Sequence, residues 1–425
     1  MANNDVTLTV GRARNVSCLL DRIQRALVER RQLGLLTVTV LGVQPDISDR
    51  WADYERVLDE ISAFLGFFSK HRLRHSDLLL EPVVTGNTYV LLIGPPRDSR
   101  TMDLKDVHLV RERLIRELRR HLAEHLEPEQ IERYSTYVGS ARIHHAPDAE
   151  IERVVYRGIE EAQAEALSQS RVDAHRHAAS LRQLLMSQDV HMVYQPLVDM
   201  VEHRVIGYEA LTRLPGGQFK SPDLVFKIAA EQGVLWSLER LCRQRALETL
   251  PQLTKEQRLF INVEPDSFYD PWLRSRAFLD QLRDVGLDPS RVVLELTERA
   301  VVKDYVEMRK VLREVRKLGY PLALDDVGSG YAGLQTIAEI RPDYLKMDMA
   351  LIRNLHLDPI RRELIRTVRT FADSTGTTLV AEGVETIAEL ETLAGTGVRC
   401  AQGFLFARPD NPPKQPDWSA LPNHS

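Results

Sequence analysis

Apolar residues follow two different patterns along the chain. Over residues 1–150 they mark elements in the order strand, helix, strand, strand, helix, strand, which predicts a compact α/β domain. Thr85-Gly86-Asn87 separates the second strand from the third and predicts a hairpin. The strands are expected within 35–43, 77–93 and 134–143, and the helices at 51–70 and 103–125.

The next segment, 148–186, is almost free of glycine and proline and is rich in Ala, Glu, Arg and Gln. This composition predicts a helix. The helix is either a connecting helix between domains, over 151–187, or the last helix of the first domain.

The second pattern covers residues 188–409, where apolar strand-like runs alternate mostly with helical stretches. This pattern predicts a modified (β/α)8 barrel of the TIM type. The first two runs are separated only by the short polar turn 200–204, so we expect them to pair antiparallel. Residues 410–425 are proline-rich and aperiodic, which predicts a flexible tail. The eight runs lie at 193–198, 205–211, 259–264, 292–297, 322–326, 344–348, 378–382 and 400–405.

Composition narrows the class of protein. With 43% hydrophobic and 28% charged residues, the chain is typical of globular proteins and unlike disordered ones. A net charge of -5 argues against binding to a nucleic-acid polymer. Cys18, Cys242 and Cys400 are far apart, so they predict neither a disulfide framework nor a zinc site. We find no secretory signal and no apolar stretch of membrane-spanning length, which predicts a cytoplasmic protein without membrane contact.

Polar side chains stand near the ends of nearly all the predicted barrel strands. Because active sites of such barrels lie at the carboxyl ends of the strands, we expect these side chains to converge. So many carboxylates would repel one another without a counter-charge. The residues, in chain order, are Glu209, Arg213, Asn262, Glu295, Glu298, Asp325, Asp326, Lys346, Asp348, Glu382, Glu385 and Gln402.

Hard divalent cations would supply that counter-charge. Carboxylates and an amide oxygen, without Cys or His, suit Mg²⁺ or Mn²⁺. The adjacent Asp325 and Asp326 favour one carboxylate that bridges two such ions, a site suited to in-line displacement at a phosphodiester. Lys346 would then orient the attacking water or stabilise phosphoryl charge. The groups expected to hold phosphates or bases are Gln195, Arg213 and Gln402.

At these residues the chain resembles the EAL family of cyclic di-GMP phosphodiesterases over about 188–409. The naming motif is Glu209-Ala210-Leu211, with Tyr194-Gln195-Pro196 before it and Thr212-Arg213 after it. The later motifs follow in order as FINVEP with Asn262, ELTE with Glu295 and Glu298, LDDVGSGYAGL with Asp325 and Asp326, YLKMD with Lys346 and Asp348, AEGVE with Glu382 and Glu385, and QGF with Gln402.

The resemblance implies two ions of Mg²⁺ or Mn²⁺ per active site, hydrolysis of cyclic di-GMP to linear pGpG, and a homodimer formed through the EAL domain. Its ligands for one ion are Glu209, Asn262, Glu295 and Asp325, and for the other Asp325, Asp326 and Glu382. Its catalytic residues are Lys346 at the nucleophilic water, Glu298 fixing the loop after Asp325-Asp326, and Glu382.

One position departs from the family pattern. The family usually has DDFG, whereas Val327 replaces the Phe here and removes an aromatic anchor from the loop. This change motivates an alternative function, a catalytically silent cyclic di-GMP receptor that signals through a protein partner.

The first domain, 1–150, resembles a degenerate diguanylate cyclase (GGDEF) fold. Residues 85–89 stand where GG(D/E)EF would be, and Leu41-Gly42-Val43 stands where a metal-binding Asp is expected. Because neither acidic position is filled, we expect no cyclase activity and a regulatory role. Docking of a protein partner to this domain is compatible with either function of the barrel.

Two further motifs favour structural interpretations. Residues 328–333 fit GxGxxG, but Asp325 and Asp326 beside them would repel a pyrophosphate. The run from His121 to His125 spells HxxEH, the inverted zinc-protease motif, at the end of a charged helix. We expect this second motif to be a solvated helix face.

Overall fold

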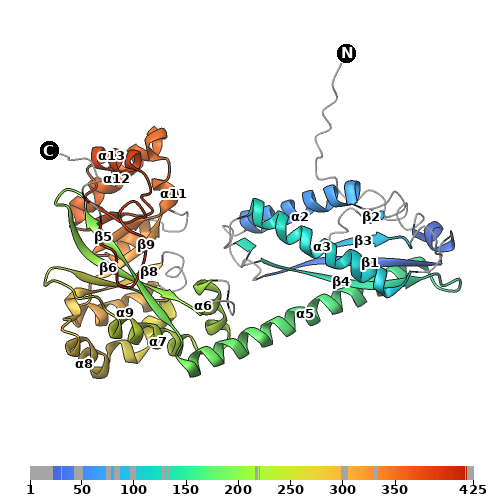
Figure 1. The fold of residues 1–425 in the computed structure, drawn as a ribbon, viewed down its shortest axis with the longest axis horizontal. Coiled ribbons are helices and arrows are strands. Elements are labelled where there is room, and N and C mark those ends of the chain that lie inside the picture. The colour runs from blue at the N-terminus through green and yellow to red at the C-terminus, as the bar shows by residue number, and fades with distance from the viewer. Residues whose placement is uncertain are drawn as a thin grey trace, which may run out of the picture. The chain divides into compact units, whose positions relative to one another are not determined.

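The computed structural model describes residues 23–29, 31–42, 51–72, 78–80, 87–95, 102–126, 130–131, 134–215, 219, 221–297, 305–328, 334–416 and 418. The chain divides into two compact units, residues 1–176 and 177–425. The division falls inside helix α5 (Ile151–Ser187) (Figure 1).

The first unit has an antiparallel sheet with the strand order β2-β3-β1-β4. The predicted order of strands and helices is confirmed, and β2 and β3 form the two arms of the predicted hairpin. This order and pairing are those of a split βαβ fold. The elements are β1 (Gln32–Gly42), α2 (Trp51–Arg72), β2 (Leu78–Leu80), β3 (Thr88–Ile93), α3 (Leu104–His125) and β4 (Tyr134–His144).

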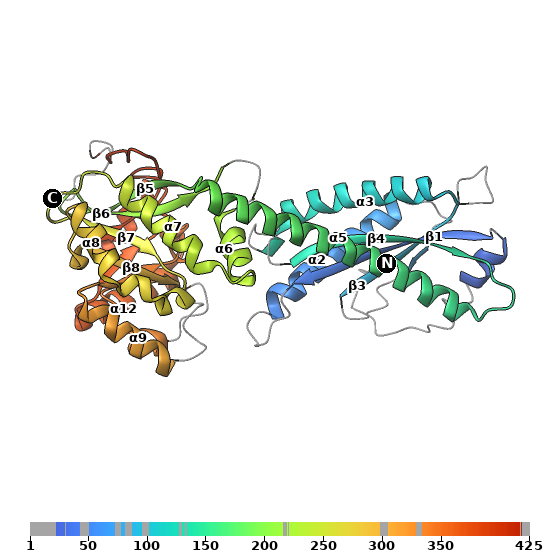
Figure 2. The same cartoon turned by 90° about the horizontal axis from the view of Figure 1, so that it is seen from below.

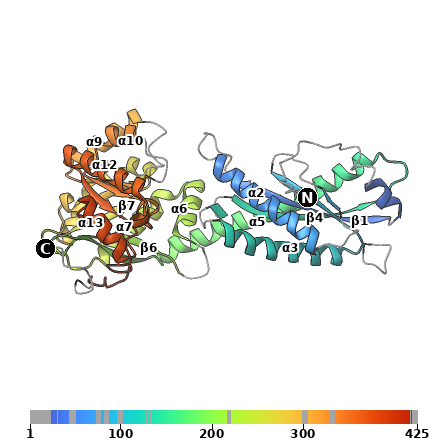
Figure 3. The same ribbon diagram turned by 90° about the horizontal axis from the view of Figure 1, so that it is seen from above.

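The sheet separates two apolar cores, because successive side chains of a strand point to opposite faces. Leu36 and Val38 of β1 face α2 and α3, which lie side by side on one face of the sheet (Figures 1 and 3). Leu35 of β1 faces the other core, to which α5 contributes Val155 and Ala162. Thus α5 covers the face of the sheet opposite to α2 and α3.

Gly139 lets α5 approach β4 closely, and its replacement should destabilise the first unit. A Cβ at this position would lie 1.7 Å from the carbonyl oxygen of Ala162. Since backbone cannot yield as a flexible side chain does, Gly139→Ala should lower the free energy of unfolding by about 1–3 kcal/mol or more in urea titrations. The matched control is Gly66→Ala in α2, where a Cβ meets open space. Equal stability of the two variants would contradict this packing.

The second unit is a closed barrel of eight strands in the order β10-β11-β12-β5-β6-β7-β8-β9. β5 runs antiparallel to both neighbours and the other pairs are parallel, which confirms the antiparallel start predicted from the short first turn. The strands are β5 (His191–Asp199), β6 (Arg204–Arg213), β7 (Arg258–Asn262), β8 (Val292–Thr297), β9 (Leu322–Val327), β10 (Tyr344–Met347), β11 (Thr378–Ala381) and β12 (Cys400–Ala401).

Helices surround these strands on the outside (Figures 2 and 3). Their apolar faces pack against outward-facing strand residues and form the larger core. They are α6 (Pro222–Glu231), α7 (Leu235–Glu248), α8 (Arg276–Asp284), α9 (Tyr305–Lys317), α10 (Leu334–Ile340), α11 (Met349–Ile352), α12 (Pro359–Thr375) and α13 (Ile387–Thr396), with the 3-10 turns η2 (Pro265–Tyr269), η3 (Pro271–Arg274), η4 (Pro289–Arg291) and η6 (Leu355–Leu357).

The barrel interior is closed by an apolar layer with one residue from each of seven strands. Phe260 and Tyr344 meet in this layer edge to face, with ring centroids 5.1 Å apart. The layer places the site, because the inward-facing residue two positions further along each parallel strand begins the next layer. The residues of the apolar layer are Leu197, Phe260, Val293, Ala323, Tyr344, Val380 and Cys400.

The start of the predicted tail lies against the barrel. Asp410 forms a bridge with Tyr194 of β5, and the side chain of Asn411 donates to the carbonyl oxygen of Met192 over 3.1 Å. Gln415 donates to the hydroxyl of Tyr208 over 2.9 Å. Residues 410–415 are thus hydrogen-bonded to the first two strands.

Among the residues that the structure describes, none of the helices combines the length and apolar character needed to cross a membrane.

Candidate active site

A polar layer stands directly above the apolar layer of the barrel. Lys346 of β10 is fully buried at its centre and forms ion pairs with four carboxylates from four other strands or strand ends. Its Nζ lies 3.4 Å from Glu209, 3.0 Å from Glu295, 3.4 Å from Asp325 and 2.8 Å from Glu382. The barrel therefore brings Lys346 and these four carboxylates together, as we expected from the sequence.

The side chains converge because of the period of two along a strand. Tyr344 belongs to the apolar layer and Lys346 follows two residues later on the same face. Val293 and Glu295 are related in the same way in β8. Register then aligns neighbouring strands. Asn262 lies opposite Glu295 in the pairing of β7 with β8.

Glu209 is held by side-chain amides, of which Gln195 and Gln402 are buried and Asn262 is exposed. Asn262 donates from Nδ2 to one oxygen of Glu209 over 2.9 Å, and Gln402 donates to the other over 2.7 Å. Gln402 also donates to Oε1 of Gln195 over 3.0 Å, and Gln195 donates to the carbonyl oxygen of Ala407. Gln195 and Gln402 are only 7% and 4% exposed. In this structure both therefore orient Glu209, and their predicted contact with substrate stays a prediction.

Asp325, Asp326 and Glu382 form a second group of donors. Their carboxylate oxygens lie within 4.8 Å of one another. The chain turns sharply here, since Asp326 has a φ of 59°, in the left-handed region that most residues avoid. The backbone N–H of Asp326 donates to Oδ1 of Asp325 over 3.0 Å, which fixes that carboxylate.

The cluster is short of positive charge. One ammonium faces four carboxylates, so full ionisation leaves three excess negative charges in a buried space. Burial, then repulsion from the other carboxylates, holds the pKa of Glu295 well above its usual range. Burial and repulsion from Asp325 raise the pKa of Glu382 in the same way. A further cation would relieve this repulsion.

The environments of Lys346 and Glu209, in contrast, favour the charged forms of these two side chains. Burial favours the neutral amine of Lys346, but the four carboxylates outweigh burial and raise its pKa well above the usual value. Burial also opposes ionisation of Glu209, yet the charge of Lys346 and the amide hydrogen bonds lower its pKa.

The donors fit hard divalent cations. Glu295 is fully buried, and neither of its oxygens receives a hydrogen bond, so its ion pair with Lys346 leaves acceptor capacity unused. Buried acceptors of this kind are normally satisfied. Because the surrounding donors are carboxylate and amide oxygens, the set suits Mg²⁺ or Mn²⁺.

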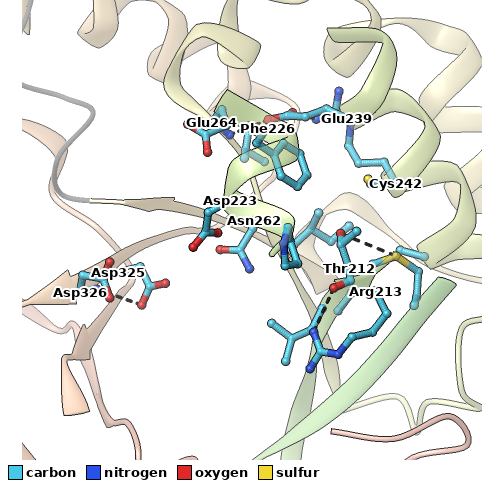
Figure 4. A pocket seen from close by; sticks show the side chains of 18 residues that line it. Thr212, Arg213, Asp223, Phe226, Glu239, Cys242, Asn262, Glu264, Asp325 and Asp326 are labelled. Carbon is cyan, nitrogen blue, oxygen red and sulfur yellow. Dashed lines mark hydrogen bonds and ion pairs between the residues drawn. The ribbon is translucent and has the colours of Figure 1, made fainter. Parts of the chain in front are cut away.

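A cavity of about 350 Å³ adjoins the cluster and shares Asn262, Asp325 and Asp326 with it (Figure 4). Arg213 lies exposed on its wall, and its guanidinium donates to the carbonyl oxygen of Thr212 over 2.9 Å. Phe226 of α6 adds an aromatic wall. The cavity thus joins a cationic group and an apolar surface to the candidate metal site.

Sequence reasoning missed the charged wall of this cavity. Arg243 of α7 is buried, pairs with Glu239 one turn earlier, and lies 3.6 Å from Asp270. Glu239 accepts from the backbone N–H of Glu264 over 2.7 Å. The only signal for this network is an i,i+4 Glu–Arg pair, which is usually a surface feature.

Asp348 and Glu385 of the matching motifs lie apart from the cluster, and Glu298 falls in a part of the chain that the structure does not describe. Asp348 caps α11 by accepting from the N–H of Ala350 over 2.6 Å. Glu385 forms an ion pair with Arg353 over 3.0 Å. Val327 is buried in the core and pairs with Met347 of β10.

Comparison with known proteins agrees with this architecture. Over 57% of its length, the chain is 24% identical to the EAL domain of Xanthomonas citri FimX, solved in complex with c-di-GMP. The alignment covers 96% of that domain with a TM-score of 0.51, which shows a shared fold.

Curated relatives match the same part of the chain. A cyclic di-GMP phosphodiesterase of Pseudomonas aeruginosa is 30% identical over 59% of this chain and 44% of its own length. An uncharacterized signaling protein of Caulobacter vibrioides is 32% identical over 55% of this chain and 29% of its own length. The chain thus matches less than half the length of these relatives. The EAL domain family model matches residues 178–409, more than half of the chain, so the chain belongs to the EAL domain family.

Proposed function

We propose that the chain is a metal-dependent phosphodiesterase that hydrolyses cyclic di-GMP to linear pGpG. The observation that carries the proposal is the buried cluster of four carboxylates around Lys346, with unused acceptor capacity on Glu295. The named activity of the Pseudomonas relative supports the choice of substrate.

Two ions of Mg²⁺ or Mn²⁺, when bound, would lower the pKa of water and neutralise charge on the phosphodiester. The set proposed for one ion is Glu209, Asn262, Glu295 and Asp325. The set proposed for the other is Asp325, Asp326 and Glu382, whose mutual proximity supports this grouping.

The remaining side chains have roles that follow from their contacts. Gln402 and Gln195 keep Glu209 in one orientation through their buried hydrogen bonds. Lys346, which burial and the carboxylates keep in place, would hold the attacking water and offset phosphoryl charge. Arg213, at the cavity wall, would bind a phosphate, because a guanidinium suits phosphate geometry. Glu298 is proposed to fix the loop after Asp326.

The reaction adds one water across one phosphodiester bond of the ring. A water oxygen forms a bond to phosphorus, the bond from phosphorus to the leaving sugar oxygen breaks, and that oxygen takes up a proton. Chromatography with mass detection tests this outcome: pGpG should appear as the product. Saturable binding of cyclic di-GMP without any product would instead assign the chain to the silent receptors.

The first unit is proposed to regulate the barrel without cyclase activity. In the described part of its sheet, β1 carries Leu41 where the resemblance calls for a metal-binding Asp. Asn87 stands at the start of β3, where its side chain donates to the carbonyl oxygen of Val40 over 2.8 Å. Residues 85 and 86 lie outside the described residues. Incubation with GTP and Mg²⁺ should yield no cyclic di-GMP.

We further propose that the barrel unit forms a homodimer through α12. Leu357 at the end of η6 and Ile360 and Leu364 of α12 are 72%, 80% and 44% exposed, and Phe371 of α12 continues the row at helical spacing. Large apolar side chains gathered on one face are typical of an interface, and a second copy would cover them.

Sedimentation should find a dimer whose dissociation constant rises at least about 10-fold in Ile360→Glu. Glu363→Gln, a polar change on the same helix, is the control. A wild-type monomer at all concentrations would contradict the dimer.

A further inference from the structure

We propose that the first unit contains a metal site of a different kind, formed by Glu60 of α2 and His121 and His125 of α3, for a borderline divalent cation such as Zn²⁺. The donor atoms of these three residues lie within 4.8 Å of one another. The site is independent of the function proposed for the barrel. We expected this part of α3 to be a solvated helix face, but the third donor comes from another helix, 61 residues earlier.

The geometry suits tetrahedral coordination. Nε2 of His121 lies 3.1 Å from Oε2 of Glu60. Two ligands of a tetrahedral zinc ion, each bonded at about 2.0–2.1 Å, lie about 3.3 Å apart. This pair is therefore already at ligand spacing. His125 stands one turn after His121, with the two ring centroids 4.1 Å apart, and one of its ring nitrogens lies within 4.8 Å of the other two donor atoms.

The tautomer of His125 is set for metal binding. Its Nδ1 lies 2.8 Å from the carbonyl oxygen of His121, and since a carbonyl only accepts, Nδ1 carries the hydrogen. The lone pair is then on Nε2, the usual arrangement for a ligating histidine whose other nitrogen is held by a carbonyl group. The ring of Phe64 packs against that of His121 at 5.3 Å and restricts its orientation.

The donor set distinguishes this site from the barrel. Two imidazoles and one carboxylate are a set that zinc accepts in open sites, with water as the fourth ligand. The oxygen donors of the barrel suit Mg²⁺ instead. Access is open, since the side chains of His121 and Glu60 are 23% and 27% exposed and His125 is exposed. An ion here would cross-link α2 to α3.

Competition between the full chain and a chromophoric chelator for Zn²⁺, with excess Mg²⁺ present, tests the site. His125→Ala and Glu60→Gln should each weaken the same equivalent of Zn²⁺ at least about 10-fold. His108→Ala, an exposed histidine of the same helix, should bind like the wild type. Because His125 is exposed, its variant should keep its fold, which circular dichroism checks. Unchanged Zn²⁺ affinity and stoichiometry in His125→Ala would overturn the proposal, whether or not the barrel hydrolyses cyclic di-GMP.

Discussion

Asp325→Asn should lower kcat/KM for cyclic di-GMP on the order of 10³-fold, similar to the loss of one strongly stabilising catalytic group. Asp325 contacts Lys346 at 3.4 Å and lies with Asp326 and Glu382 in the group of clustered carboxylates. It belongs to both proposed ligand sets, so its change to a neutral amide weakens both. Steady-state kinetics at saturating Mn²⁺ measures the effect.

The control for this variant is Glu385→Gln. Glu385 also follows a barrel strand, but it pairs with Arg353 and lies outside the cluster. The control should keep its turnover within a few-fold of the wild type. If Asp325→Asn retained wild-type turnover, Asp325 would not be a shared ligand.

Lys346→Met should abolish turnover and also lower the stability of the metal-free chain. Removing one partner of a buried ion pair typically costs about 3–5 kcal/mol. Here the loss leaves Glu209, Glu295, Asp325 and Glu382 facing one another without their central cation. Urea unfolding in the presence of a chelator measures the cost, and Mg²⁺ or Mn²⁺ should restore part of it.

The loss of stability in Lys346→Met should depend on pH and should become smaller as pH falls. The folded-state pKa values of Glu295 and Glu382 already lie well above their usual range because of burial and repulsion. A carboxyl group of this kind is stabilising at low pH, and its contribution is lost as pH rises through the folded-state pKa. Loss of Lys346 should raise these values further, so the deficit in Lys346→Met should shrink as pH falls. Lys317→Met, at an exposed ion pair with Glu314, is the control. A deficit independent of pH would contradict the arrangement.

The barrel could be predicted from the chain because local patterns determine it. Each strand-like run found by its apolar residues overlaps an observed strand, and the short first turn predicted the antiparallel pairing of β5 with β6. The convergence on Lys346 was equally accessible. Polar residues at the ends of parallel strands must meet when the sheet closes.

Features that depend on distant packing could not be predicted in this way. Gln195 and Gln402 are 207 residues apart, and only the closed barrel makes them neighbours on Glu209. Arg243 of α7 has the pattern of a helix surface residue, but it is buried beside Asp270 and lies over the ring of Trp272 of η3. Glu60 and His121 meet only because α2 and α3 pack on one face of the sheet.

The most direct test of the central claim is a time course of pGpG formation from cyclic di-GMP by the purified chain. We predict product in the presence of Mg²⁺ or Mn²⁺, none after treatment with a chelator, and recovery when the metal is restored, because the buried carboxylates around Lys346 need further cations. Absence of product with either metal, or turnover that the chelator leaves unchanged, would contradict the account.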